Sequence, residues 1–460
     1  MFRPDVSNGV CNPLLLSVAL GFSTTLSLHY SMDYVTTLLS IYCSICSVFI
    51  CIRMYAKCHP PGCLASTIVN NLIFDNYPRA SKLQAKELID CFHIPYFAPI
   101  IYSLFFLING STSSNKFLLC AIPFMYVYPI ILPKLFVTFT KSFSFGEGSL
   151  VLQAPFLFIY KQCIDSIWLI EDGTSQIGGY VIIARMTLFV VILWSLLTMR
   201  YTSKFYFIGA VLIFGVYFPY LWLRLKRNLL VWVINDLSDF SDVLLLLFWA
   251  SLVTFALFYV YKFKQGTSNT IARKSFHLLI SLVYISGDIF NTEILYLCSM
   301  AMISIFLLVE LVRYYQIKPF GALLNHYFKL FLDSKDSGPL VLTNIYLLVG
   351  VSIPIWLVIP TNRVLNLSGV LAIGIGDSAA SIIGSKFGRM QWNSKSKKTI
   401  EGTFASLFAQ MCTIWVIAPE DVWIGFGVSV VSSVIELLTD QVDNLIIPLA
   451  VHSVGIFLKH

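Results

Sequence analysis

The sequence predicts an all-α, polytopic integral membrane protein with about 13 to 15 transmembrane helices and no soluble domain. Two observations support this fold class. Apolar residues make up 57% of the 460 positions and charged residues only 12%, whereas an average soluble domain carries about 25% charged residues. Apolar runs long enough to cross a bilayer also recur along the whole chain. A surface so poor in charge is solvated by lipid.

The apolar runs give the expected order of the spans. Residues 1–13 lack a basic stretch and a small-residue cleavage site, so we expect Leu14–Tyr30 to be a retained span rather than a signal peptide. The other expected spans are Tyr34–Cys51, Ile94–Ile108, Phe117–Thr138, Leu150–Ile170, Tyr180–Leu197, Phe205–Leu223, Val243–Tyr261, Phe276–Phe290, Ile294–Val312, Leu340–Ile359, Leu367–Ile383, Phe404–Ala418, Val422–Leu437 and Leu445–Leu458.

Polar interruptions and cysteines add little to this outline. Arg53–Cys91 is expected to be a loop with an amphipathic piece on the membrane surface. Leu225–Asp242 is a second interruption, and its sequence leaves open whether Leu229–Ile234 enters the bilayer. Cys43 and Cys46 form a CxxC inside an apolar run, with no second pair and no histidine at zinc spacing. We therefore expect neither a metal site nor disulfides from the cysteines.

The charges of the second half predict its topology. Three basic loops follow one another at intervals of two spans, so they fall on one side: Lys262–Lys274, Arg313–Lys335 and Lys386–Lys398. The loops on the other side are short and hold little positive charge: Gly287–Glu293, Thr361–Asn366 and Pro419–Asp421. The positive-inside rule places the basic loops in the cytosol. The glycosylation sequons at Asn109 and Asn366 would lie close to the membrane, so we expect poor use of them.

Asp377 lies within or at the end of the apolar run that begins near Leu367. An ionised carboxylate in the bilayer costs about 2.5 to 3.5 kcal/mol, so it needs a reason. Two interpretations stay open: pairing with a Lys or Arg, or service in a site, for example by holding Mg²⁺ against phosphate oxygens. Small residues recur every four positions from here, which favours close helix packing or the close approach of a phosphate: Gly376, Ala380, Gly384 and Gly388.

A basic loop follows this stripe. It holds five cations and one acid: Lys386, Arg389, Lys395, Lys397, Lys398 and Glu401. Such a loop is either a topology signal that contacts lipid headgroups or an anion site. Gly402 and Thr403 enter the next span, where N–H groups at a helix start favour an anion. The loop matches neither the P-loop pattern, nor the dinucleotide fingerprint, nor the protein kinase signatures.

Other polar residues of the second half are weaker candidates. His277, beside Arg273 and Lys274, is either a helix-end histidine bonded to backbone or a partner of a phosphate or carboxylate. Glu310 and Arg313 are spaced as an ion pair that fixes a loop. Further carboxylates could border the basic loop: Asp333, Asp336, Asp440 and Asp443.

These motifs together resemble the dolichol kinase family. Asp377-x-x-Ala380-x-x-x-Gly384-x-x-x-Gly388, followed by Lys397-Lys398-Thr399-x-Glu401-Gly402-Thr403, resembles the CTP-binding pattern of that family. Further segments resemble the family in the same order, so that the likeness covers roughly residues 273–448: Arg273–Leu279, Glu310–Pro319, Leu332–Leu340 and Asp443–Leu449.

The resemblance implies a kinase of the endoplasmic reticulum membrane that transfers the γ-phosphoryl group of CTP to the terminal hydroxyl of dolichol. Its product, dolichyl phosphate, is a carrier for N-glycosylation and related mannosylation and GPI-anchor pathways. The implied partners are dolichol in the bilayer and CTP, with no nucleic acid. Residues 1–261 then form an N-terminal transmembrane region and 262–460 the catalytic region, with the CTP loop at 385–402.

On this resemblance, Asp377 is expected to hold Mg²⁺, and Asp443 or Asp377 to accept the proton of the dolichol hydroxyl. The residues expected to bind CTP are Ser385, Lys386, Gly388, Arg389, Lys395, Lys397, Lys398, Thr399, Glu401 and Gly402. Two alternatives remain: an enzyme like CTP:phosphatidate cytidylyltransferase, which transfers CMP, and a membrane transporter. The two halves of the chain do not repeat each other, which argues against a transporter.

Overall fold

The computed structural model describes residues 39, 42–43 and 46, parts of 123–162, and residues 179–225, 239–263, 269–328, 339–357, 362–392, 398–438 and 443–459. The chain divides into two compact units. The first comprises residues 1–175, 332–343 and 438–446, and the second comprises 176–331, 344–437 and 447–460. The expected spans Leu14–Tyr30 and Ile94–Ile108, most of Tyr34–Cys51, and the surface loop Arg53–Cys91 lie outside the described residues.

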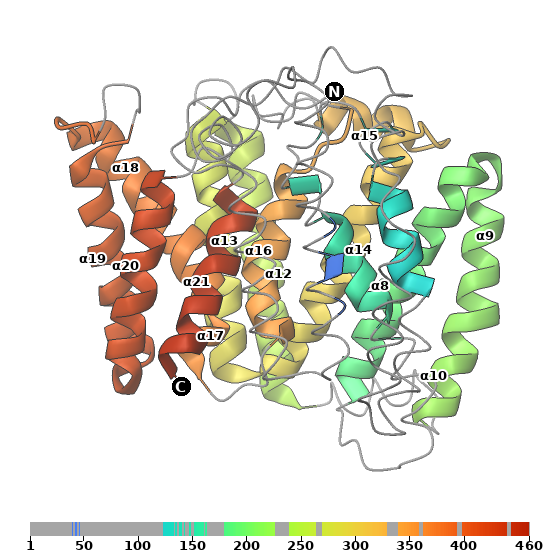
Figure 1. Ribbon diagram of the computed structural model, residues 1–460, viewed down its shortest axis with the longest axis horizontal. Helices are drawn as coiled ribbons and strands as arrows, with labels where there is room; N and C mark the ends of the chain where they lie inside the picture. Colours follow the sequence, from blue (N-terminus) through green and yellow to red (C-terminus); the bar gives the residue numbers. More distant parts are fainter. Residues whose placement is uncertain are drawn as a thin grey trace, which may run out of the picture. The chain divides into compact units, whose positions relative to one another are not determined.

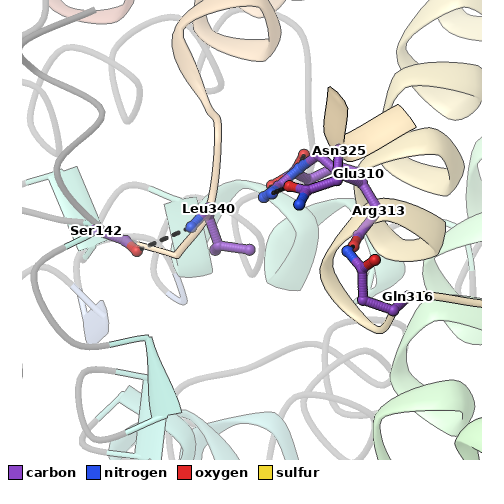
Figure 2. A network of polar contacts seen from close by, with 6 residues as sticks. All are labelled: Ser142, Glu310, Arg313, Gln316, Asn325 and Leu340. Carbon is purple, nitrogen blue, oxygen red and sulfur yellow. Dashed lines mark hydrogen bonds and ion pairs between the residues drawn. The ribbon is translucent and has the colours of Figure 1, made fainter. Parts of the chain in front are cut away.

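The described part of the first unit is helical and rich in aromatic contacts. Pro123–Leu132 and Val151–Tyr160 are apolar helices within two of the expected spans. The ring of Phe124 meets those of Phe156 and Tyr160 edge to face, with centroids 5.0 and 5.4 Å apart. In the same unit the backbone N–H of Leu340 donates to Ser142 Oγ at 3.5 Å (Figure 2).

The second unit is a set of apolar helices, of which the terminal residues Thr343, Leu438 and Asp443–Ile446 belong to the first unit (Figure 1). They are α8 (Gly179–Arg200), α9 (Phe205–Leu212), η3 (Ile213–Tyr217), α10 (Phe218–Leu225), α12 (Phe240–Phe263), α13 (Asn269–Phe290), α14 (Thr292–Tyr314), α15 (Gly321–Phe328), α16 (Thr343–Leu357), α17 (Arg363–Asn366), η4 (Val370–Asp377), α18 (Ser378–Phe387), α19 (Ile400–Ile417), α20 (Val422–Leu438) and α21 (Asp443–Lys459), with short 3₁₀ turns at Thr202–Lys204 and Pro419–Asp421.

These elements confirm an all-helical, polytopic membrane protein. Five helical segments of the described residues are long and apolar enough to cross a bilayer: Gly179–Arg200, Thr202–Leu225, Thr292–Tyr314, Val370–Phe387 and Ile400–Ile417. Shorter apolar helices include Phe240–Ala256, Phe276–Phe290 and Thr343–Trp356. Each of these eight helices overlaps a span expected from the sequence. The total of about 13 to 15 spans for the whole chain stays a prediction.

The surface of the helices is apolar where lipid is the solvent. Phe207, Phe214 and Trp222, on the continuous helix from Thr202 to Leu225, are 68%, 71% and 62% exposed. On its inner side, Trp194 of α8 stacks on Phe205 with ring centroids 4.8 Å apart, and its indole N–H donates to the Phe205 carbonyl at 3.0 Å. This helix is thus anchored at its start, and most of its length faces lipid.

The second unit brings its three short loops with little positive charge to one end. Arg363 Nε donates to Asp288 Oδ2 at 3.2 Å, and Arg363 Nη1 donates to the Ile417 carbonyl at 3.0 Å. Asn366 Nδ2 donates to Asp288 Oδ1 at 2.9 Å. These residues come from the end of α13, from α17 and from the end of α19. The contacts agree with the sorting of these loops to one side by parity.

Candidate active site

Asp377 is the last residue of the π-helix η4, directly before α18. Its side chain is only 13% exposed, and Oδ2 lies 3.5 Å from Nδ1 of His277. The Ser381 hydroxyl, one turn further along α18, donates to Oδ1 at 3.4 Å. A π-helix gives up regular i→i+4 bonding and is common at functional sites. The carboxylate is therefore held between two helices at an irregular point of the backbone.

His277 reaches Asp377 because α13 approaches η4 closely at a glycine. A Cβ added to Gly374 would lie 2.0 Å from Ser281 Oγ, so only glycine fits there. His277 is 4% exposed, and its Nδ1 lies 3.4 Å from the Ile373 carbonyl as well as near Asp377. Both interpretations of this histidine, a backbone contact and a carboxylate partner, are present. The side chains of Arg273 and Lys274 lie outside the described part.

The stripe of small residues packs α18 against α19. A Cβ added to Gly384 would lie 2.9 Å from Thr399 Oγ1, and one added to Gly402 would lie 2.9 Å from the Ala380 carbonyl. A Cβ on Gly376 would lie 2.5 Å from Gln410 Nε2. The absence of side chains at these positions lets the two helices approach. The expected packing role is confirmed, and phosphate contact with the stripe stays a prediction.

The basic loop is a small hairpin between these two helices. Gln391 and Thr399 form an antiparallel bridge, and the Ile400 N–H donates to the Met390 carbonyl at 2.9 Å. The Glu401 carboxylate accepts the N–H groups of Arg389 and Met390 at 2.9 and 3.2 Å. Glu401 thus ties the first arm of the hairpin to the start of α19. The tip, with Lys395 and Lys397, lies outside the described residues.

The N–H groups at the start of α19 are bonded within the helix itself. Thr399 is the N-cap, and its hydroxyl accepts the Gly402 N–H at 3.2 Å while its carbonyl accepts the Thr403 N–H at 3.1 Å. A threonine N-cap satisfies the donors that a helix start otherwise exposes. The N–H groups of Gly402 and Thr403 are thus engaged at the helix start, and contact of these residues with CTP stays a prediction. Gly402 and Thr399 shape the hairpin, which leaves side-chain cations as the described donors for phosphate.

Those cations differ in their settings. Lys386 and Arg389 are exposed at the end of α18, close to Ser385, whose hydroxyl donates to the Ile382 carbonyl at 3.1 Å. Lys398 is half-buried, and its Nζ donates to the Glu436 carbonyl in the last turn of α20. A cation there is favourable because helix C-termini carry partial negative charge. Gly388 is in close contact with Gly384 and Thr399, so it also serves packing.

Four further carboxylates were expected to border the basic loop. Asp443 begins α21 and lies in the first unit, whereas Asp377 lies in the second. A role for Asp443 beside the hairpin therefore stays a prediction. Asp333, Asp336 and Asp440 lie outside the described residues. Within the described part, no group of three or more His, Cys, Asp or Glu side chains is arranged for a metal.

The pair Glu310–Arg313 closes the end of α14, as its spacing predicted. Arg313 donates from Nε and Nη2 to the two carboxylate oxygens of Glu310, at 2.7 and 2.6 Å, and both residues are buried. Arg313 also bonds to Asn325 of α15 at 3.3 Å, and its carbonyl accepts from Gln316 at 2.6 Å (Figure 2). A bidentate ion pair with these extra contacts orients the loop that follows α14.

Sequence reasoning missed one feature of the site. Gln410 and Ser406 of α19 lie against Gly376, next to Asp377, and both are 0% exposed. Their spacing of four residues places them on one helix face, and a glutamine inside an apolar run is the signal that could have drawn attention to them.

Comparisons with known proteins identify the family. The family model described as "Dolichol kinase" matches residues 111–413. The chain belongs to the dolichol kinase family. The dolichol kinases of Homo sapiens and Bos taurus are 35% and 34% identical to it over 365 and 363 residues, in each case 71% of this chain and 66% of the relative. A dolichol kinase of Schizosaccharomyces pombe is 28% identical over 349 residues, 67% of each chain. No solved structure matches the chain.

The dolichol kinase match covers part of the candidate site and part of the relatives' length. It contains Asp377, the hairpin and the first 14 of the 18 residues of α19, and it ends before Asp443. The chain spans 66% of the length of the human, bovine and mouse dolichol kinases that it matches.

Proposed function

We propose that this chain is a dolichol kinase that transfers the γ-phosphoryl group of CTP to the terminal hydroxyl of dolichol. Dolichyl phosphate, the product, would serve as the lipid carrier for N-glycosylation, related mannosylation and GPI-anchor synthesis. The observation that carries the proposal is the joining of Asp377 to a cationic hairpin through the close packing of α18 on α19. A carboxylate in an apolar run, at the start of the helix that leads to the cationic hairpin, suits a lipid acceptor and a polyphosphate donor.

Phosphoryl transfer requires chiefly positioning and charge neutralisation. In the proposed site the cations of the hairpin neutralise the phosphates: Lys386, Arg389, Lys395, Lys397 and Lys398. Glu401 and Thr399 hold the hairpin in shape, and Gly388 and Gly402 let it lie close to α18. Ser385 adds a hydroxyl beside Lys386. Asp443 or Asp377 accepts the proton of the dolichol hydroxyl.

Asp377 fits the requirements of a magnesium site that is completed by substrate. Mg²⁺ is usually bound by one or two carboxylates together with substrate phosphates rather than by a full protein cage. When bound, it would supply charge neutralisation between phosphate oxygens. His277 and Ser381 would keep the Asp377 carboxylate in place for this contact.

The decisive experiment uses the purified full chain with dolichol, Mg²⁺ and CTP labelled at either the γ- or the α-phosphate. A kinase gives labelled lipid from γ-labelled CTP only. Label from α-labelled CTP alone would instead identify a cytidylyltransferase. Asp377→Asn and Lys398→Ala are compared with the wild type. Full activity in both variants would refute this assignment of the site.

The proposal places the protein in the endoplasmic reticulum membrane, with the hairpin facing the cytosol. The support is the positive-inside pattern together with the gathering at one end of the loops that hold little positive charge. Gln391→Cys puts a thiol on the exposed hairpin. In sealed microsomes, a membrane-impermeant maleimide should label this variant more than the wild type without detergent. Extra labelling that appears only after permeabilisation would reverse the orientation.

A further inference from the structure

Five polar side chains of α19 and α20 are buried. Each is at most 4% exposed: Ser406, Gln410, Ser429, Ser432 and Ser433. We call this set the polar seam. Polar side chains inside a transmembrane bundle are costly and mark substrate paths or specific helix contacts. The seam therefore needs a physical explanation beyond helix packing alone.

The register of the two helices aligns the seam. They are joined by the short turn Pro419–Asp421, and a Cβ added to Gly425 would lie 2.7 Å from Ile414 Cγ2. In an antiparallel pair with that contact, Gln410 comes opposite Ser429. Side chains three or four residues apart share a helix face. The same stripe of α20 continues to Glu436, whose carbonyl accepts from Lys398.

The hydroxyl groups of the seam behave differently from other serines of the bundle. Ser281, Ser304 and Ser352 each donate to a carbonyl one turn earlier in their own helix, at 2.8, 2.7 and 2.6 Å. The hydroxyls of Ser429, Ser432 and Ser433 have no hydrogen-bond partner among the described residues, and neither does Gln410 Oε1. Such groups are costly in a low-dielectric interior. The seam therefore favours binding of a ligand that carries a polar group.

The seam lies next to the candidate catalytic carboxylate. Gln410 Nε2 donates to Ser406 Oγ at 3.1 Å. A Cβ added to Gly376 would lie 2.5 Å from Gln410 Nε2 and 2.8 Å from Ser406 Oγ, so both side chains contact the backbone directly before Asp377. A polar group bound by Gln410 would thus be close to that carboxylate.

The outer faces of the same helices suit a hydrocarbon chain. Phe404, Phe408 and Trp415 of α19 are 63%, 72% and 72% exposed. Trp423 and Phe426 of α20 are 86% and 47% exposed. An apolar chain can lie on these faces in the membrane while a single polar end enters between the helices.

We propose that the polar seam binds the hydroxyl end of a long-chain polyisoprenoid alcohol, and that Gln410 is the residue that selects for the hydroxyl. The Gln410 amide oxygen accepts the O–H, and a serine hydroxyl of α20 donates to the alcohol oxygen. An alcohol satisfies both partners, whereas an ether lacks the O–H donor and a hydrocarbon of the same length has neither donor nor acceptor, so both should bind more weakly. This inference deepens the proposed function and rests on it for the identity of the lipid.

The test is a binding competition on the full chain in lipid nanodiscs. Labelled dolichol is displaced by unlabelled dolichol or by its methyl ether, which lacks the O–H donor. The wild type should prefer the alcohol by about 3- to 10-fold, the range expected for one neutral hydrogen bond. Gln410→Leu, of similar size, should bring this preference to about 1. Its melting temperature should change little, because the variant removes an unpartnered amide oxygen together with the hydrogen bond to Ser406.

A matched control lies on the same helix. Thr413 donates to the Ala409 carbonyl at 2.8 Å and lies outside the seam, so Thr413→Val should keep the preference for the alcohol. If the wild type shows no preference, or if Gln410→Leu keeps it, the inference is wrong and the seam serves helix packing.

A catalytic measurement separates this inference from the proposed function. If the chain phosphorylates dolichol, Gln410→Leu should raise KM for dolichol by about 3- to 10-fold and leave KM for CTP unchanged. If no phosphoryl transfer occurs while the preference for the alcohol is present and depends on Gln410, the seam is supported and the kinase proposal fails.

Discussion

His277 Nδ1 lies 3.5 Å from Asp377 Oδ2, across the contact between α13 and the π-helix η4. The two residues are 100 positions apart in the sequence, and both belong to the second unit. The same nitrogen lies 3.4 Å from the Ile373 carbonyl, one turn before Asp377. An Nδ1–H shared between these two oxygens orients the carboxylate relative to the backbone that carries it.

We predict that His277 acts on activity through Asp377. Asp377→Asn should lower kcat on the order of 10²-fold or more. His277→Leu should lower it by about 10- to 100-fold, because the carboxylate is no longer oriented. His277→Asn places an amide N–H near the position of Nδ1 and should keep most of the activity. Steady-state kinetics of purified variants measure these effects.

A double-mutant cycle checks this prediction. In the Asp377→Asn background, His277→Leu should cost little further activity, because the partner it orients is already changed. Independent, multiplying effects of the two substitutions on kcat would show that His277 supports the fold rather than the carboxylate.

Glu401 should control the affinity for CTP through the shape of the hairpin. Glu401→Ala removes the acceptor of the Arg389 and Met390 N–H groups, so the amide of Met390 should exchange faster with deuterium. KM for CTP should rise by roughly 3- to 10-fold. Glu420→Ala removes an exposed acid at the opposite end of α19 and should change neither quantity. Equal effects of the two variants would argue against the role of Glu401.

Lys398 and Lys386 should differ in what they stabilise. Lys398→Met removes both a proposed phosphate contact and the contact to the Glu436 carbonyl, so it should raise KM for CTP and lower the melting temperature by about 1 to 4 °C. Lys386→Met should raise KM for CTP alone, because Lys386 is exposed. Thermal unfolding measured beside the kinetics separates the two effects, and a loss of stability in Lys386→Met would contradict this distinction.

The contact of α18 with α19 should not tolerate a side chain at Gly402. The Cβ of Gly402→Ala would lie 2.9 Å from the Ala380 carbonyl, so the helices must separate, at a cost of about 1 to 3 kcal/mol in unfolding free energy. Gly215→Ala is the matched control, because a Cβ there meets nothing within 4 Å. The control should be neutral or slightly stabilising in a thermal or denaturant unfolding experiment. A stable Gly402→Ala protein would refute this packing.

The ion pair of Asp288 and Arg363 should matter for stability. Asp288 is buried, and Arg363→Met leaves its carboxylate without this cation, which should cost about 3 kcal/mol. Asp288→Asn in the same chain should recover a large part of this loss, because the buried charge is removed. Unfolding of the single and double variants tests this, and a neutral Arg363→Met would show that the pair contributes nothing.

Helix positions were predictable because membrane thickness sets the length of an apolar run. The run Tyr180–Leu197 became α8, Gly179–Arg200. Where a helix in the structure begins at another residue than expected, a specific contact explains the difference. The span expected from Phe404 begins at Ile400, because Thr399 caps the helix. That cap was readable in the sequence, since threonine is a favoured N-cap.

Site details depended on which helices meet. The spacing of Gly376, Ala380 and Gly384 predicted close packing, and the structure supplies α19 as the partner. The π-helix before Asp377 could not be predicted, because no local pattern marks it. The polar seam as a whole could not be predicted from the sequence either, although Gln410 inside an apolar run was a signal for one of its members. Its serines are ordinary in a helix, and the seam forms only when α19 faces α20.

The contact of Asn366 with Asp288 also has a consequence for biosynthesis. The Asn366 amide that would carry a glycan is 3% exposed and is bonded to Asp288 within the folded unit. A sugar could be attached to this sequon only before α13 and α17 come together. Occupancy at Asn366 would therefore record the order of events during synthesis, and glycosylated copies would be those in which oligosaccharide transfer preceded helix association.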